Sequence, residues 1–148
     1  MIHVYEFEIF PDEGMYSAIP FDMEGGTCGS DFDDACFMAG DWLRTEMEQR
    51  DIRDEGFPHA TFGNEPRHPG GKVIAFATDA GRDTVRKVTA SEAARMLDVT
   101  PGRVTQMIDA GLLTAWREGH RTWVSVDSVN ARLAESPKAG RPKKTAMA

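Results

Sequence analysis

VTASEAARMLDVTPGRVTQMIDAGLLTAWREGHRTWVSV, residues 88–126, is the stretch that decides the fold of the C-terminal part of the chain. Its first half predicts two short helices. Thr89 followed three residues later by Glu92 is the pattern of a capping box, in which each side chain bonds the other residue's backbone amide at a helix start. Thr100 and Pro101 predict the start of the second helix, because threonine is a good N-cap and the missing amide of proline costs nothing in the first turn.

The second half of this stretch predicts a two-stranded ribbon. Gly111 is expected to end the second helix, and strand-forming residues on both sides of residues 118–120 indicate a hairpin. Trp116 and Trp123 would form a cross-strand pair that packs the ribbon onto the helices. Two helices joined by a tight turn and followed by such a ribbon make a winged helix-turn-helix.

The second helix presents side chains that can read the edges of DNA bases. Val104, Met107 and Ile108 fall at helical spacing and are expected to face inward, which leaves a polar outer face near the start of the helix. Arginine and glutamine can each form two hydrogen bonds with a base edge, and basic residues at a hairpin tip can meet phosphates. The candidate DNA-binding residues are Thr100, Gly102, Arg103, Thr105, Gln106, Arg117, His120 and Arg121.

Four short motifs carry a resemblance to a known family of DNA-binding domains. They are SEAARML at residues 91–97, LDVTPGRV at 97–104, IDAGLL at 108–113 and VDSV at 126–129. Together they resemble the MerR and excisionase type of winged helix-turn-helix, in which Asp127 would cap a closing helix that runs through Leu133. MerR regulators continue into a long coiled coil and a sensing domain, whereas this chain stops some twenty residues after the wing, so the sensing part is expected to lie upstream or to be absent. The alternative to a DNA-binding role for residues 88–126 is a small helical subdomain that packs against a partner and never touches DNA.

The N-terminal part predicts a small antiparallel sheet and one long helix. Alternating apolar and polar residues, interrupted by turns rich in proline and glycine, indicate the strands. The four predicted strands cover residues 3–10, 15–19, 27–29 and 72–77. Asp31 is the expected N-cap of the helix, whose apolar residues recur every three or four positions from Phe32 to Met47. The sequence therefore predicts an α+β protein: an antiparallel βββαβ domain followed by a mostly helical winged helix-turn-helix domain.

A hairpin closed by proline, a glycine-rich loop and a marked helix start follow one another in this N-terminal part. The helix start has the residues Thr27, Gly29, Asp33, Asp34 and Ala35. This pattern, over residues 3–80, resembles the HicB antitoxin domain, although PFDMEG at residues 20–25 replaces the proline-aspartate-leucine-proline-glycine run common there. The resemblance implies a partial ribonuclease-H-like sheet that neutralises a small toxin ribonuclease and is often followed by a DNA-binding domain.

Charge divides the chain into the same two parts. Residues 1–83 hold 18 acidic and 6 basic residues, net −12, whereas residues 84–148 hold 6 acidic and 11 basic residues, net +5. A basic part with a helix-turn-helix fits nucleic acid, and an acidic part suits a basic protein partner. The predicted organisation is a toxin-binding domain at 1–79, a linker at 80–87, a DNA-binding domain at 88–136 and a disordered basic tail at 137–148.

The predicted function is that of an antitoxin that blocks a small basic HicA-like, mRNA-cleaving toxin and represses its own operon by binding operator DNA. Acidic side chains on the exposed face of the N-terminal helix are the candidate toxin-binding residues: Asp34, Asp41 and Glu48. A homodimer or higher oligomer is expected, since a single recognition helix buries little surface on DNA. A regulator of the excisionase or ligand-responsive type, without a toxin, is the alternative.

Catalysis, metal binding and membrane insertion are not expected. A metal-dependent nuclease would need carboxylates that converge, and Glu6 or Glu8 with Asp31, Asp33 or Asp34 are the candidates. The aspartates already have a simpler role at a helix start, where negative charge is favourable. The two cysteines lack the neighbours of a zinc site, and no apolar run approaches the roughly 18 residues of a membrane span. We therefore expect a cytoplasmic protein without a cofactor.

Overall fold

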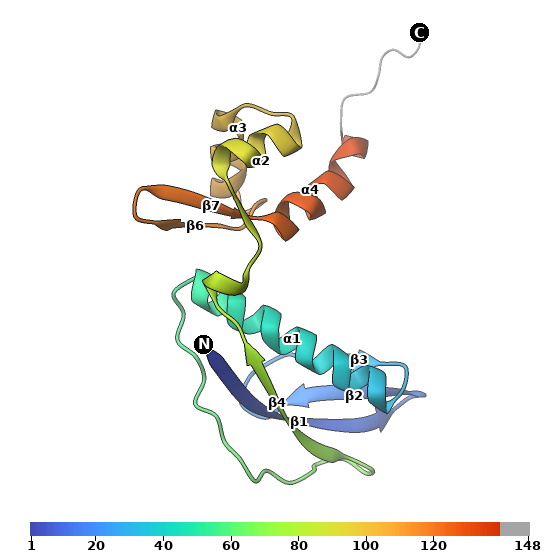
Figure 1. Ribbon diagram of the computed structural model, residues 1–148. Coiled ribbons are helices and arrows are strands. Elements are labelled where there is room, and N and C mark those ends of the chain that lie inside the picture. The colour runs from blue at the N-terminus through green and yellow to red at the C-terminus, as the bar shows by residue number, and fades with distance from the viewer. Residues whose placement is uncertain (140–148) are drawn as a thin grey trace. The chain divides into compact units, whose positions relative to one another are not determined.

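The chain forms two compact units in the computed structural model, which describes residues 1–139 (Figure 1). The first unit comprises Met1–Thr84, and the second begins at Val85. Both contain helices and antiparallel strands, so the α+β class predicted from the sequence is confirmed. No helix within the described residues is long and apolar enough to cross a membrane.

The first unit is one antiparallel sheet with a long helix across one face (Figure 1). Its elements are β1 (Ile2–Asp12), β2 (Met15–Pro20), β3 (Thr27–Gly29), α1 (Phe32–Ile52), β4 (Lys72–Asp79) and the 3-10 helix η1 (Arg82–Thr84). The strand order is β3-β2-β1-β4, in which β1 pairs with both β2 and β4. Strands β3 and β4 are therefore the two edges of this sheet.

Helix α1 begins and faces the sheet as its sequence predicts. The Asp31 side chain accepts the Asp34 amide at 2.8 Å, which confirms the predicted N-cap. Four residues of its apolar stripe are completely buried: Ala35, Ala39, Leu43 and Met47. They pack against Phe7 and Ile9 of β1 in the core of the unit, and the helix continues to Ile52, beyond the predicted apolar stripe.

Half of the residues predicted as a linker, 80–87, belong to a helix or strand. Ala80 is buried at 1% exposure, and the Arg82 amide donates to the Asp51 carboxylate of α1 at 2.8 Å. These contacts bind η1 to the first unit. Lys87 lies in a strand of the second unit, and the Arg86 carbonyl accepts the Val126 amide of that unit at 2.9 Å, so the predicted linker is divided between the two units.

The second unit combines three helices with a small sheet. Its elements are β5 (Lys87–Thr89), α2 (Ala90–Leu97), α3 (Pro101–Asp109), β6 (Ala115–Glu118), β7 (Arg121–Ser125) and α4 (Val126–Ala139), and the sheet order is β5-β7-β6. The capping box of Thr89 and Glu92 is confirmed by both of its hydrogen bonds, at 3.1 and 2.8 Å. Thr100 caps α3 through the Arg103 amide at 3.1 Å, as predicted.

The start of α4 differs from the prediction. The amide of Ser128 is accepted by the Ser125 hydroxyl at 3.2 Å, so Ser125 caps the first turn instead of Asp127. Asp127 pairs with Arg86 at 2.9 Å. The helix runs past Leu133 to Ala139, so residues 137–139 of the predicted basic tail are helical, and the remainder of that tail lies outside the described residues.

Candidate functional site

The outward face of α3 carries the polar side chains that the sequence predicts there. Val104 and Met107 are buried in the core of the second unit, at 0% and 3% exposure, which fixes the orientation of the helix. The exposed residues are Gly102, Arg103, Thr105 and Gln106. The Arg103 guanidinium donates to the Gln106 amide oxygen at 3.3 Å, so the two side chains suited to base edges lie together.

The β6–β7 hairpin holds three basic side chains near its tip. Arg117, His120 and Arg121 are all exposed, and the turn between the strands contains Gly119 at φ +62°. The Arg117 guanidinium donates to the Thr122 hydroxyl across the hairpin at 3.3 Å. The hairpin thus presents cationic groups to solvent from a backbone that its strand pairing holds in place.

The two tryptophans of the hairpin are direct cross-strand partners, as predicted. Trp116 is buried, and its ring nitrogen donates to Glu118 at 3.1 Å. Trp123 lies under two cations, with Lys87 Nζ 4.7 Å and Arg121 Cζ 5.5 Å from its ring centre. Lys87 is not among the residues predicted for this site, because its contacts depend on the β5–β7 pairing, which no local pattern indicates.

Two hollows lie beside the β6–β7 hairpin. One, of about 290 Å³, lies between α3 and the hairpin and has Thr105 on one wall and Arg117 on the other. The second, of about 400 Å³, lies at the start of α2 beside His120 and Arg121 and is also lined by Ser91. Amides at a helix start and basic side chains at a hairpin tip are both suited to phosphate. Sequence reasoning did not single out Ser91.

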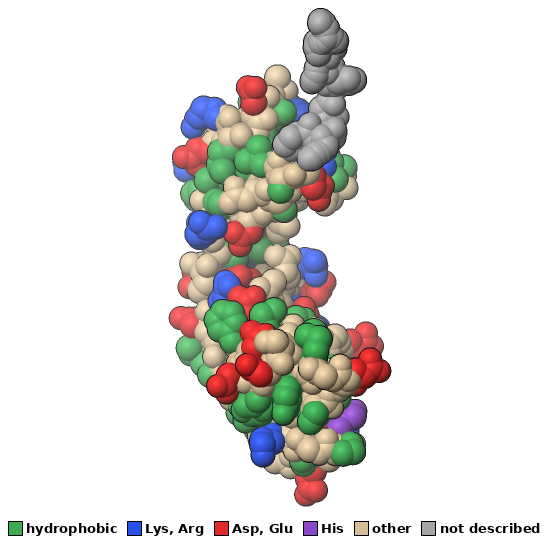
Figure 2. Space-filling model, turned by 90° about the vertical axis from the view of Figure 1, so that its right-hand side faces the viewer, with side chains coloured by type: hydrophobic (Ala, Val, Ile, Leu, Met, Phe, Trp, Pro, Cys, Tyr) green, Lys and Arg blue, Asp and Glu red, His purple; other side chains and the backbone are tan. Residues whose placement is uncertain are grey.

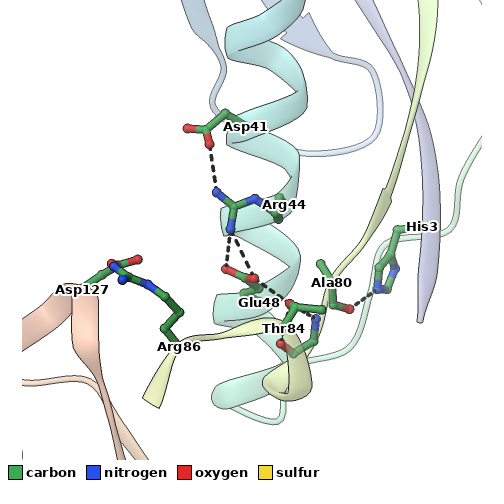
Figure 3. Close-up of polar contacts among 9 residues, drawn as sticks. His3, Asp41, Arg44, Glu48, Ala80, Thr84, Arg86 and Asp127 are labelled. Carbon is green, nitrogen blue, oxygen red and sulfur yellow. Dashed lines mark hydrogen bonds and ion pairs between the residues drawn. The ribbon is translucent and has the colours of Figure 1, made fainter. Parts of the chain in front are cut away.

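The three acidic residues predicted to form one exposed face of α1 have different environments. Asp34 accepts the amide of Ser30 at 2.8 Å and closes the loop before the helix. Asp41 is exposed and pairs with Arg44 at 3.0 Å. Glu48 is buried at 7% exposure, where it accepts the Thr84 hydroxyl at 2.6 Å and faces Arg44 at 3.4 Å (Figure 3). The prediction that Glu48 lies on the exposed face is wrong, because η1 packs over it.

Two carboxylates of β1, those of Glu8 and Glu6, anchor the long loop between α1 and β4. Glu8 of β1 is 2% exposed and accepts the amides of Arg67 and His68 at 3.0 and 2.9 Å and the His68 ring nitrogen at 3.0 Å. Burial alone would raise the pKa of the Glu8 carboxyl, but the bonds from His68 and the Arg67 amide hold it below the ordinary glutamate value. The His68 ring also stacks on Phe10 at 3.7 Å.

Glu6, two residues before Glu8 in β1, binds the same loop. Its carboxylate accepts the Asn64 amide at 3.0 Å, the Asn64 side chain at 2.9 Å and the Gly63 amide at 3.1 Å. These bonds, first that of the Asn64 amide, lower the pKa of Glu6. Both carboxylates considered for a metal site are thus engaged by the loop. No residue near them in the sequence reveals these partners.

Comparison with known proteins gives one structural neighbour to report. No protein-family model matches the chain, and no curated protein matches it by sequence. The structure is similar to a chain of a toxin–antitoxin complex from Streptococcus pneumoniae, with a TM-score of 0.50 and 15% sequence identity. The match covers 75% of this chain and 99% of that chain. At this identity the likeness shows a shared fold.

Proposed function

We propose that this chain is the antitoxin of a toxin–antitoxin pair and that it also represses its own operon. The fold that it shares with a chain of the Streptococcus pneumoniae toxin–antitoxin complex carries this proposal. The HicB resemblance of residues 3–80 supplies the subtype: a partial ribonuclease-H-like unit whose partner is a small basic HicA-like toxin. The toxin would be blocked by contact, which covers its RNA-binding surface or catalytic residue.

The second unit is proposed to bind operator DNA as a winged helix-turn-helix of the MerR or excisionase type. The exposed start of α3 has the size and polarity that fit the major groove, with Arg103 and Gln106 as the base-reading residues. Arg117, His120 and Arg121 on the hairpin would meet phosphates. Since one such unit buries little surface, two copies would act together on half-sites about 34 Å apart.

The first unit is proposed to attract the toxin by its charge. Its net charge of −12 over residues 1–83 would steer a cationic protein, and acidic side chains are interspersed with hydrophobic ones on the face in Figure 2. Asp34 and Asp41 remain candidate contacts, because neither is buried. Glu48 is no longer a candidate, since its carboxylate is occupied inside the unit.

We propose that the protein acts without catalysis or a cofactor. Glu6 and Glu8 are engaged by backbone amides of the loop, while Asp31 and Asp34 hold the start of α1. Asp33 lies in the first turn of the same helix, where negative charge is favourable, so each carboxylate that could have suggested a nuclease has a structural role. Since operator DNA and messenger RNA are both cytoplasmic, the cytoplasm is the proposed location.

Substitutions on α3 and on the hairpin should weaken DNA binding in different ways. Arg103→Ala should cost about 1–3 kcal/mol on the operator and little on random DNA, because base contacts carry specificity. Arg121→Ala should weaken binding to both duplexes and reduce the salt dependence, because phosphate contacts release counterions. Fluorescence titration of promoter and random duplexes at several salt concentrations measures both effects. Arg53→Ala, an exposed change in the first unit, is the control. Equal losses on both duplexes for Arg103→Ala would remove it from base reading.

A further inference from the structure

Strand β4 forms an open edge of the first sheet. In the order β3-β2-β1-β4, it pairs only with β1 among the described residues. Between Lys72 and Asp79 its sequence is VIAFAT, which contains no charge, proline or glycine. Soluble proteins usually protect such an edge with charges, proline or a bulge, because its free amide and carbonyl groups pair readily with another strand. Between Lys72 and Asp79, β4 has neither the charged residues nor the proline that would protect it from such pairing.

A groove runs beside this edge, between β4 and α1. It has a volume of about 510 Å³ and is lined by Cys36, Phe37, Gly40, Asp41, Arg44 and Ala77. Phe37 is 71% exposed, the highest exposure among the large hydrophobic side chains of the described residues. A Cβ atom at Gly40 would have no neighbour within 4 Å, so packing inside the chain does not require glycine there. Glycine weakens a helix interior, and its place on the groove suits close approach by a partner.

We propose that β4 and this groove are where a second copy of the chain docks, by antiparallel pairing of the two β4 strands. The ends of the strand carry opposite charges, so a two-fold axis between Ala75 and Phe76 would set Lys72 of one copy opposite Asp79 of the other. Asp79 is 62% exposed even though it binds the α-amino group at 2.9 Å. The two α1 helices would lie on the same face of one continuous sheet.

The groove itself is also self-complementary. Asp41 and Arg44 carry opposite charges on one exposed stripe of α1, with Phe37 one turn away. Across a two-fold axis the helices run antiparallel, which lets Asp41 of each copy approach Arg44 of the other, while the Phe37 rings, one turn before Asp41, cover the two outer ends of the contact. Asp41 lines the groove and would be occupied in the dimer, whereas Asp33 and Asp34 do not line it, so in the dimer the start of α1 is the part of the helix that stays available to a toxin.

The overall charge gives this association a distinctive dependence on salt. Two units of net −12 repel each other, and this repulsion is screened over about 8 Å at physiological ionic strength. Salt also weakens the ion pairs across the axis, so the two effects oppose each other and the dimer should respond weakly to salt between about 50 and 300 mM. A cationic partner in the groove would instead bind progressively more weakly as salt rises, so the size of the salt effect separates these two occupants.

The inference deepens the proposed function, because a dimer brings together the two copies that an operator with two half-sites requires. Its test uses the full chain alone, without DNA or toxin. Sedimentation over a range of concentrations gives the association constant, and hydrogen exchange of the β4 amides locates the contact. We expect β4 to become protected as concentration rises. Phe37→Asp should remove this protection and weaken association about tenfold or more.

The control is Phe62→Asp, which changes an aromatic residue of similar exposure, 60%, outside the groove. It should leave both measurements unchanged. Ala75→Lys, which adds a charge to the exposed middle of β4, should act like Phe37→Asp. If hydrogen exchange of the β4 amides does not depend on protein concentration, β4 is not the contact and the inference is overturned. This holds even if the chain sediments as a dimer. Equal behaviour of Phe37→Asp and Phe62→Asp, or protection only on addition of another protein, would overturn it as well.

Discussion

Gly29→Ala should destabilise the first unit by about 3 kcal/mol or more, which corresponds to a loss of roughly 15 °C in its melting temperature. Gly29 ends β3 and lies against the first turn of α1. A Cβ atom there would clash with the backbone nitrogen of Ala35 and would lie 2.6 Å from the carbonyl carbon of Asp34. Both are backbone atoms, so a side-chain rotation cannot relieve the contact. Strand β3 would have to separate from the helix that covers the sheet.

Thermal unfolding followed by circular dichroism measures this effect. Gly56→Ala is the matched control, because nothing lies within 4 Å of the Cβ position there. It should change the free energy of unfolding by less than about 0.5 kcal/mol. A Gly29→Ala variant as stable as Gly56→Ala would show that β3 does not pack on α1 as described.

Glu8→Ala should have the second largest effect, a loss of about 3 kcal/mol from the free energy of unfolding. The change removes a buried carboxylate that accepts three hydrogen bonds from Arg67 and His68. It leaves backbone amides without a partner, and hydrogen bonds to charged groups contribute about 1.5–3 kcal/mol each. The loop should then detach from the sheet, and its amides should exchange faster. Glu65→Ala, an exposed change in the same loop, should be nearly neutral.

The same carboxylate predicts a dependence of stability on pH. The pKa of Glu8 is lower in the folded unit than in the unfolded chain, as is that of Glu6. Their contribution is therefore complete above the unfolded-state pKa of about 4.3 and is lost as pH falls through the lowered pKa. Urea unfolding between pH 7 and pH 3 should show a smaller decline for Glu8→Ala than for the native chain. Parallel declines would contradict this role of Glu8.

The sequence predicts best those features whose partners lie close along the chain. The helix starts at Asp31, Thr89 and Thr100 each depend on a hydrogen bond to a backbone amide three residues on, and all three are found. The polar outer face of α3 follows from the spacing of Val104 and Met107, which are buried. These features need no knowledge of the tertiary fold, so a local pattern is sufficient to find them.

Features that depend on distant contacts were not predictable in this way. Glu8 bonds residues 59 and 60 positions away, and nothing near it in the sequence distinguishes it from a solvent-exposed strand residue. Glu48 has the spacing of an exposed helix position, but Thr84, 36 residues later, returns to cover it. At the start of α4, Ser125 and Asp127 could both cap the helix, but the helix begins at Val126, which places Ser125 at the cap and Asp127 inside the first turn.

The central claim is that toxin neutralisation and operator binding reside in different units. The most direct test expresses residues 1–84, residues 85–148 and the full chain, each with a small basic HicA-like toxin, and measures growth and operator binding. We predict that residues 1–84 restore growth without binding the operator, and that residues 85–148 bind the operator without restoring growth. Restored growth from residues 85–148 alone, or failure of the full chain to restore growth while it still binds the operator, would contradict the account.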